Sequence, residues 1–153
     1  FVVRYLAATG ARVSELVQIK IEHVSIGYFD IYTKGGKVRR LFIPKKLRDE
    51  TLVWLQNNGR GSGYLFLNRF GERITTRGIA QQLKNYAVKY KLNPKVVYPH
   101  SFRHRFAKNF LEKYNDISLL ADLMGHESIE TTRIYLRKTS TEQREIVDNV
   151  VIW

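Results

Sequence analysis

The chain has 153 residues, of which 44% are hydrophobic and 26% charged, so it has the length and composition of one globular domain rather than of a disordered segment. Lysine and arginine number 26 against 14 acidic residues, and the formal net charge of +12 favours a polyanionic partner, DNA or RNA before an anionic membrane surface. The chain holds no cysteine, which excludes a disulfide framework and any cysteine zinc site and fits an intracellular protein.

Hydrophobic periodicity predicts a mostly helical chain. Apolar residues recur at helical spacing, and the helices expected from them cover residues 1–8, 14–17, 46–57, 76–91, 102–114, 117–124, 128–136 and 139–151. A period of two appears over 28–33 and again over 38–43, with Gly35 and Gly36 between the two runs, which predicts a tight antiparallel hairpin. A further short strand is expected over 64–67. The predicted fold class is therefore mostly α with one small antiparallel β-sheet.

Four short motifs resemble, in their order and intervals, those of the tyrosine recombinases, the phage integrase type of DNA strand transferase. They are an arginine motif at 9–16 (TGARVSEL), a lysine-bearing hairpin at 33–37 (TKGGK), an H-x-x-R box at 100–104 (HSFRH), and 123–126 (LMGH) followed by Tyr135. One motif of this length is weak support, whereas four in register are specific. The resemblance covers residues 8–136, and its departures, Phe102 and Met124 in place of the family's usual Leu, keep an apolar side chain.

The resemblance implies a complete reaction and the residues that perform it. The six implied catalytic residues are Arg12, Lys34, His100, Arg103, His126 and Tyr135. The tyrosine attacks a DNA phosphate and forms a 3′-phosphotyrosyl intermediate, and a 5′-hydroxyl from a partner duplex then attacks that link, so that two exchanges pass through a Holliday junction. No cofactor is implied, because the phosphotyrosyl link stores the energy of the broken bond. The acidic residues are also too scattered for a two-metal nuclease site.

The two arginines fit this chemistry on physical grounds. Attack on a phosphodiester builds negative charge on the non-bridging oxygens, and a guanidinium fork matches two oxygens. With 26 basic residues in the chain, a surface contact to DNA is the ordinary explanation of any one arginine, and only motif position singles out Arg12 and Arg103. We interpret Lys37, Arg39 and Arg40 as plain phosphate contacts.

The resemblance also assigns roles to the lysine and the histidines. Lys34 is the general acid that protonates the leaving 5′-oxygen. His100 either accepts the tyrosine proton or donates a hydrogen bond to the phosphate, and the sequence leaves both roles open. His126 follows Gly125 at a helix end and orients a phosphate oxygen. Glu15 either holds a catalytic cation in place or is a solvated helix charge.

Tyr135 has an equally simple structural interpretation. It lies on the same helical stripe as Ile129 and Thr132, so the pattern alone describes a core aromatic. A phenol with a pKa of about 10 is a poor nucleophile without cationic neighbours or a base. The step of nine residues from His126 favours the catalytic role.

The expected partners follow from the same resemblance. They are double-stranded DNA and further protomers of the same recombinase, four of which act together, while the lack of a long apolar run or a basic amphipathic anchor argues against a membrane. We expect residues 1–153 to be one catalytic domain cut from a longer protein, without that protein's N-terminal DNA-clamping domain. Residues 139–153 are expected to form a tail that docks on a neighbouring protomer. The expected location is the cytoplasm, at the nucleoid.

Two alternatives remain from the sequence. A type IB topoisomerase shares the reaction and much of the residue set, although the compact spacing of the H-x-x-R and G-H…Y motifs favours the recombinase. A non-enzymatic basic DNA-binding domain would use the arginines as phosphate contacts and Tyr135 as a core residue. That domain would bind DNA in a salt-sensitive way and form no covalent link.

Overall fold

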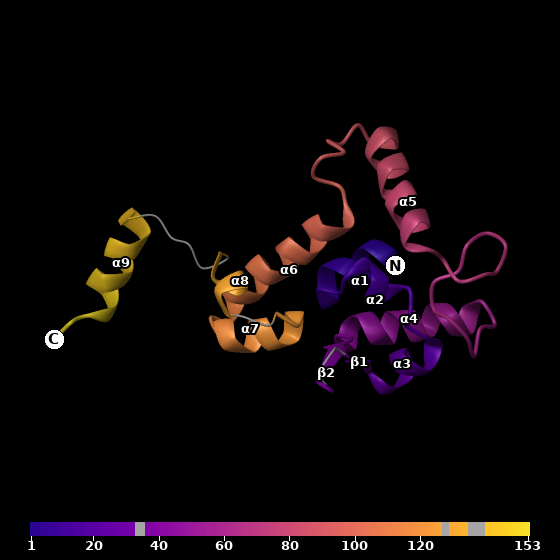
Figure 1. The fold of residues 1–153 in the computed structure, drawn as a ribbon, viewed down its shortest axis with the longest axis horizontal. Coiled ribbons are helices and arrows are strands. Elements are labelled where there is room, and N and C mark those ends of the chain that lie inside the picture. Colours follow the sequence, from indigo (N-terminus) through magenta and orange to yellow (C-terminus); the bar gives the residue numbers. More distant parts are fainter. Residues whose placement is uncertain (33–35, 127–128, 135–139) are drawn as a thin grey trace.

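The computed structural model describes residues 1–32, 36–126, 129–134 and 140–153. Its elements, in chain order, are α1 (Val2–Thr9), α2 (Val13–Leu16), α3 (Ile21–Ile26), β1 (Tyr28–Tyr32), β2 (Val38–Phe42), α4 (Lys45–Asn57), α5 (Thr76–Lys89), α6 (Pro99–Lys113), α7 (Ile117–Met124), α8 (Ile129–Arg133) and α9 (Ser140–Val150). Figure 1 shows the first half of the chain gathered around α1, with α6 running from this half towards α7 and α8. The predicted fold class, mostly α with a small antiparallel sheet, is confirmed.

The predicted hairpin is present. Its two strands pair antiparallel, with Tyr28 opposite Phe42 and Tyr32 opposite Val38. Along β2, burial alternates between exposed and buried residues, so one face of the strand is turned towards the core. The hairpin therefore packs one face of β2 on the helices.

Two elements differ from the prediction. The expected strand over 64–67 forms only isolated bridges, Tyr64 with Lys20 and Leu67 with Arg73. Its central residues, Leu65 and Phe66, are both buried, so this apolar run enters the core without the alternation of a strand. Helix α3 was not predicted, because six residues are too few to establish a helical period.

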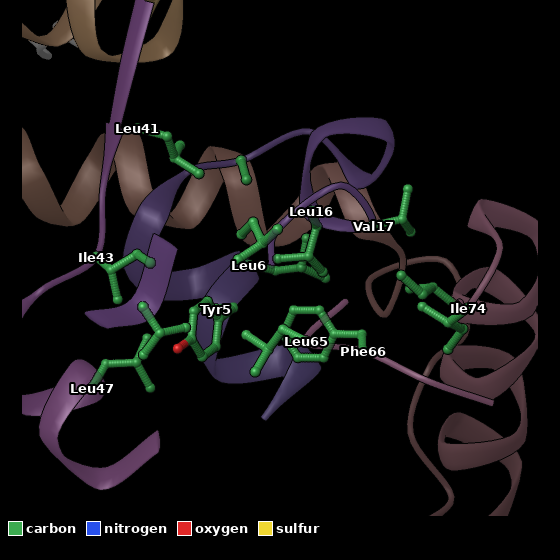
Figure 2. Packing of buried hydrophobic residues seen from close by; sticks show 14 of the residues in the cluster. Tyr5, Leu6, Leu16, Val17, Leu41, Ile43, Leu47, Leu65, Phe66 and Ile74 are labelled. Carbon is green, nitrogen blue, oxygen red and sulfur yellow. The ribbon is translucent and has the colours of Figure 1, made fainter. Parts of the chain in front are cut away.

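The larger hydrophobic cluster surrounds α1. Figure 2 shows Tyr5 and Leu6 of α1 at its centre, between Leu47 of α4 and Ile74 of the segment before α5. The buried Tyr5 hydroxyl donates a 2.8 Å hydrogen bond to Thr51 of α4. A core polar group is thus satisfied inside the cluster.

A second, smaller cluster forms between α6 and α7. Ala107 and Leu111 of α6 pack there with Leu120 and Met124 of α7, and all four are buried. Because α6 also packs against α1, it connects the two clusters. The third motif lies in the first turns of α6, and Leu123 and Met124 of the fourth motif lie at the end of α7.

Helix α9 differs from the other helices. None of its residues is buried, and it stands apart from the remaining helices in Figure 1. Within the described residues, no helix has both the length and the apolar character needed to cross a bilayer.

Candidate active site

A glycine turn places Arg12 at the surface of the site. Gly10 ends α1 with φ +69°, a left-handed conformation that favours glycine. A Cβ atom at Gly10 would lie 2.5 Å from Phe106 of α6, so glycine also allows this close approach of the two helices. Arg12 is the N-cap residue of α2. Its backbone N–H donates to Glu15 Oε1 at 2.8 Å, and its side chain is 40% exposed.

Arg103 is buried between two turns. Its residue exposure is 5%, and its guanidinium donates from Nη1 to the carbonyl of Gly10 and from Nη2 to the carbonyl of Met124, both at 2.5 Å. The first carbonyl belongs to the turn that leads to Arg12, and the second belongs to the end of α7. Arg103 therefore ties the first motif to the fourth.

His126 lies directly after the end of α7. Gly125 ends the helix with φ +72°, and the His126 backbone N–H donates to Ala121 O at 3.0 Å. The His126 Nδ1 atom lies 2.5 Å from Oγ1 of Thr132, a fully buried residue of α8. This contact fixes the orientation of the imidazole.

The three residues form one electropositive cluster. Burial lowers the pKa of His126 below its usual value, because the charged imidazolium loses solvation. Nearby positive charges lower the pKa further, in the order Arg103, Arg12 and Arg39. Arg12, Arg103 and His126, which the sequence predicted as site residues, are thus close enough to interact electrostatically.

Glu15 and Arg39 lie beside this cluster, and the interpretation of Arg39 as a plain phosphate contact is wrong. Arg39 is 6% exposed; its Nη1 and Nη2 both donate to the Glu15 carboxylate, the second at 3.1 Å. Its Nε donates to Leu123 O at 2.9 Å. Glu15 is itself 6% exposed, so it is not a solvated helix charge. Arg40, by contrast, is an exposed residue that pairs with Asp30.

Of the other predicted site residues, the structure describes His100. His100 is exposed in the first turn of α6, and its ring lies 5.9 Å from that of His104. It is three residues before Arg103 on the same helix, so it lies near the same face. Lys34 and Tyr135, with the expected helix start at Ser128, lie outside the described residues.

The sequence matches a known family along most of its length. The model of the phage integrase family matches residues 1–142, a range that includes all four motifs. The chain belongs to the phage integrase family. The resemblance seen in the motifs is therefore confirmed.

Relatives and solved structures agree with the family match. The chain is 34% identical over 157 residues to tyrosine recombinase XerD of Staphylococcus haemolyticus and 36% identical over 153 residues to tyrosine recombinase XerA of Pyrococcus furiosus. These alignments cover 95% and 96% of the chain but 52% of each relative, so the chain spans about half their length. The crystal structure of XerA recombinase matches with a TM-score of 0.73 at 27% identity, over 94% of this chain and 54% of that one. The catalytic domain of bacteriophage HP1 integrase shares the fold with a TM-score of 0.65 at 24% identity, over 99% of this chain and 81% of that one.

Membership of the integrase family gives the observed cluster a chemical context. The cluster consists of two guanidiniums, which bind anionic oxygens, and one imidazole, which can also donate or accept a proton. Among the residues described, no three His, Cys, Asp or Glu side chains gather in a way that would hold a metal ion.

Proposed function

We propose that residues 1–153 are the catalytic domain of a site-specific DNA recombinase that cuts and rejoins strands through Tyr135. The observation that carries this proposal is the cluster of Arg12, Arg103 and His126 within one electropositive site. The family match and the tyrosine recombinases among the relatives support it over a type IB topoisomerase and over a non-enzymatic domain.

The proposed cleavage step is a transesterification. The Tyr135 oxygen attacks the phosphorus, the bond from phosphorus to the 5′-oxygen breaks, and a 3′-phosphotyrosine and a free 5′-hydroxyl result. His100 takes the tyrosine proton, and Lys34 supplies a proton to the leaving 5′-oxygen. In rejoining, the 5′-hydroxyl of a partner strand attacks the phosphotyrosine and releases Tyr135.

The cationic groups stabilise the charge that develops in this step. Arg12 and Arg103 compensate the extra negative charge on the non-bridging oxygens, and His126 donates to one of them. Donors that are already in position cost no reorganisation during the reaction, and removing one typically lowers the rate by about 10²–10³. A buried Arg103, held by two carbonyls, is preorganised in this sense.

The proposed partners are double-stranded DNA at the nucleoid and other protomers of the same protein, four of them acting together on DNA. The exposed apolar side chains of α9, which include Ile146, Val147 and Val150, support a tail over 139–153 that docks on a neighbouring protomer. The isolated chain is then a monomer that assembles only on DNA. Sedimentation of a stable tetramer without DNA would contradict this part of the proposal.

The covalent intermediate is the direct test. The natural protein that contains this chain is incubated in EDTA with labelled, nicked duplexes taken from the DNA flanking its gene, and SDS-resistant adducts are separated by electrophoresis. We expect an adduct with the wild type and none with Tyr135→Phe. Binding without an adduct in the wild type would return the protein to a non-enzymatic DNA-binding module, and relaxation of supercoiled DNA without exchange between two sites would identify a topoisomerase.

Arg12→Ala is the better of the two arginine variants in this test. The Arg12 side chain is 40% exposed, so its removal leaves the packing intact. Arg103→Ala also removes two buried hydrogen bonds that hold the turns together, so its adduct yield must be read together with its melting temperature.

A further inference from the structure

Arg39 is a buried cation that contacts two segments next to site residues, α2 beside Arg12 and the end of α7 before His126. It belongs to β2, the second strand of the hairpin, and its burial shows that it does not project into solvent. One edge of its guanidinium binds the carboxylate of Glu15 in α2, and its Nε donates to Leu123 O at the end of α7. A bidentate guanidinium fixes both the distance and the angle of its partners.

The bond to Glu15 determines what Glu15 does to Arg12. Glu15 Oε2 lies 3.6 Å from Arg12 Nη1, which is beyond hydrogen-bond length, while Arg39 binds both carboxylate oxygens. Glu15 Oε1 also accepts from the Arg12 backbone N–H. Arg39 therefore neutralises the negative charge of the buried carboxylate. The Arg12 guanidinium makes no hydrogen bond to Glu15 and is available to an external anion, while Glu15 holds the Arg12 backbone in place.

The bond to Leu123 determines the position of the histidine turn. Leu123 is three residues before His126, and the intervening Gly125 lies directly against Arg39. A Cβ atom at Gly125 would lie 2.6 Å from Arg39 Cδ, so a larger residue would displace the arginine or the turn. The glycine before His126 thus serves both the left-handed helix end and the close approach of Arg39.

We propose that Arg39 is a positioning residue that holds Arg12 and His126 in one geometry for strand cleavage. The proposal rests on the proposed function, since the cleavage step is what this geometry serves. Displacement of a reacting group by about 1 Å can lower a rate by about 10²-fold. Arg39 acts through Glu15 and through the carbonyl of Leu123, not by touching DNA.

Arg39→Lys is the discriminating variant. Lysine keeps the positive charge beside Glu15, so the carboxylate is not left alone in the core, but an ammonium cannot reproduce the fork that spans Glu15 and Leu123. We expect the first-order rate of adduct formation, measured at saturating protein, to fall by about 10²-fold. We expect the Kd for DNA and the fraction of protein that reacts to stay at the wild-type values. Unfolding of the variant would lower the reacting fraction, whereas displacement of groups in the site lowers the first-order rate.

Arg60→Lys is the matched control. Arg60 also donates to backbone carbonyls, those of Leu65 and Tyr64, in the segment after α4. We expect this variant to keep the wild-type rate of adduct formation. If Arg39 were a phosphate contact, Arg39→Lys would behave like Arg60→Lys, and a wild-type rate in Arg39→Lys overturns the proposal.

Gly125→Ala tests the same contact without removing a polar group. It is expected to lower the first-order rate in the same way as Arg39→Lys. Gly59→Ala is its control, because Gly59 also has a positive φ, +64°, but a Cβ atom there would meet nothing within 4 Å. Equal rates for the two alanine variants would contradict the role of Arg39.

The failure of the two proposals is distinguishable in this experiment. A wild type that binds DNA and forms no adduct overturns the proposed function, and the role of Arg39 falls with it. A wild type that forms the adduct while Arg39→Lys and Gly125→Ala react at the same rate overturns the role of Arg39 alone.

Discussion

His126 is surrounded by positive charge, and its protonation state follows from its surroundings. Burial and the nearby arginines lower its pKa, so the neutral imidazole is favoured in the folded protein at neutral pH. When its Nδ1 accepts the hydroxyl proton of Thr132, Nε2 carries the ring proton and is able to donate to a phosphate oxygen. A neutral histidine in this tautomer is thus a hydrogen-bond donor that adds no further positive charge to the site.

The lowered pKa predicts a loss of stability in mild acid. The unfolded chain has an ordinary histidine pKa of 6.5 and the folded chain a lower one, so below pH 6.5 the unfolded state binds more protons. The free energy of unfolding should therefore fall as the pH is lowered from 6.5 through the folded pKa of His126. Urea titrations over this range, compared between the wild type and His126→Gln, isolate this contribution from the other histidines. Parallel curves for the two proteins would contradict the prediction.

The contact between His126 and Thr132 predicts a second effect. Thr132→Val keeps the shape of a buried side chain but removes the partner of Nδ1 of the half-buried His126, and the loss of a hydrogen bond costs about 0.5–1.5 kcal/mol. If that cost is expressed in the transition state, the first-order rate of adduct formation falls by up to about tenfold.

Thr51→Val is the control for the threonine variant. Thr51 is also fully buried, and its hydroxyl bonds to Tyr5 and Leu47 within the larger core cluster. It is expected to lower the melting temperature and to leave the first-order rate unchanged. A similar loss of rate in both variants would assign the effect of Thr132→Val to general destabilisation.

At the scale of single residues, the sequence predicted part of this site. Motif position predicted Arg12, Arg103 and His126, which lie together. Arg39 was assigned to the surface from its charge alone, without regard to the alternation of side chains along a strand. Arg39 is two residues before Leu41 in β2, and Leu41 is buried, so a period of two places both on the inner face. This alternation was the signal in the sequence that could have predicted the burial of Arg39.

Helix α7 ends directly before Gly125 and His126, and its N-terminus is capped by a side chain. The carboxylate of Asp116 accepts from the Leu119 backbone N–H at 2.9 Å, and a negative charge at a helix N-terminus interacts favourably with the helix dipole. In α5 the N-cap is Thr75, whose neutral hydroxyl accepts from Gly78 at 2.9 Å. The two helices offer a matched pair of caps that differ in charge.

The caps predict a graded loss of stability. Asp116→Ala and Thr75→Ala should each lower the free energy of unfolding by about 1 kcal/mol, and the aspartate variant should lose more because it also loses the charge. Asp116→Asn should recover most of the loss, since asparagine caps equally well without the charge. Denaturant titration of the three variants measures these differences. A smaller loss for Asp116→Ala than for Thr75→Ala would contradict this account of α7.

The elements themselves were mostly predictable, because long helices repeat their apolar residues several times. The helix predicted over 102–114 begins earlier in the structure, at Pro99, because a proline is accommodated in the first turn of a helix. The segment at 64–67 was mispredicted because a run of apolar residues does not distinguish a strand from a core-filling loop. Its bridge to Lys20 depends on a residue far away in the sequence, whose position follows from the tertiary fold.

At the scale of the whole molecule, the site lies where two hydrophobic clusters meet. The larger cluster supports α1 and the turn before Arg12, and the smaller one supports α7 and the turn at His126. Arg103 crosses between them through its bonds to Gly10 and Met124. The same side chain thus joins the two halves of the domain and supplies charge to the site, so its substitution affects stability and chemistry together.

The net charge predicts that salt affects the affinity for DNA much more than the rate of strand cleavage. Each phosphate that a cationic side chain neutralises releases a counterion, so with +12 on the chain and about 6–10 phosphate contacts the affinity for DNA should fall by about 10³–10⁵ between about 50 and about 200 mM salt. The first-order rate of adduct formation at saturating protein should change far less, because Arg103 and Thr132 are buried and interactions of buried groups are weakly screened. Fluorescence anisotropy and adduct formation over one salt series measure both quantities. A flat affinity would mean that the basic residues do not face DNA, and a rate that falls in parallel with the affinity would mean that solvated charges, and not the buried cluster, carry the cleavage step.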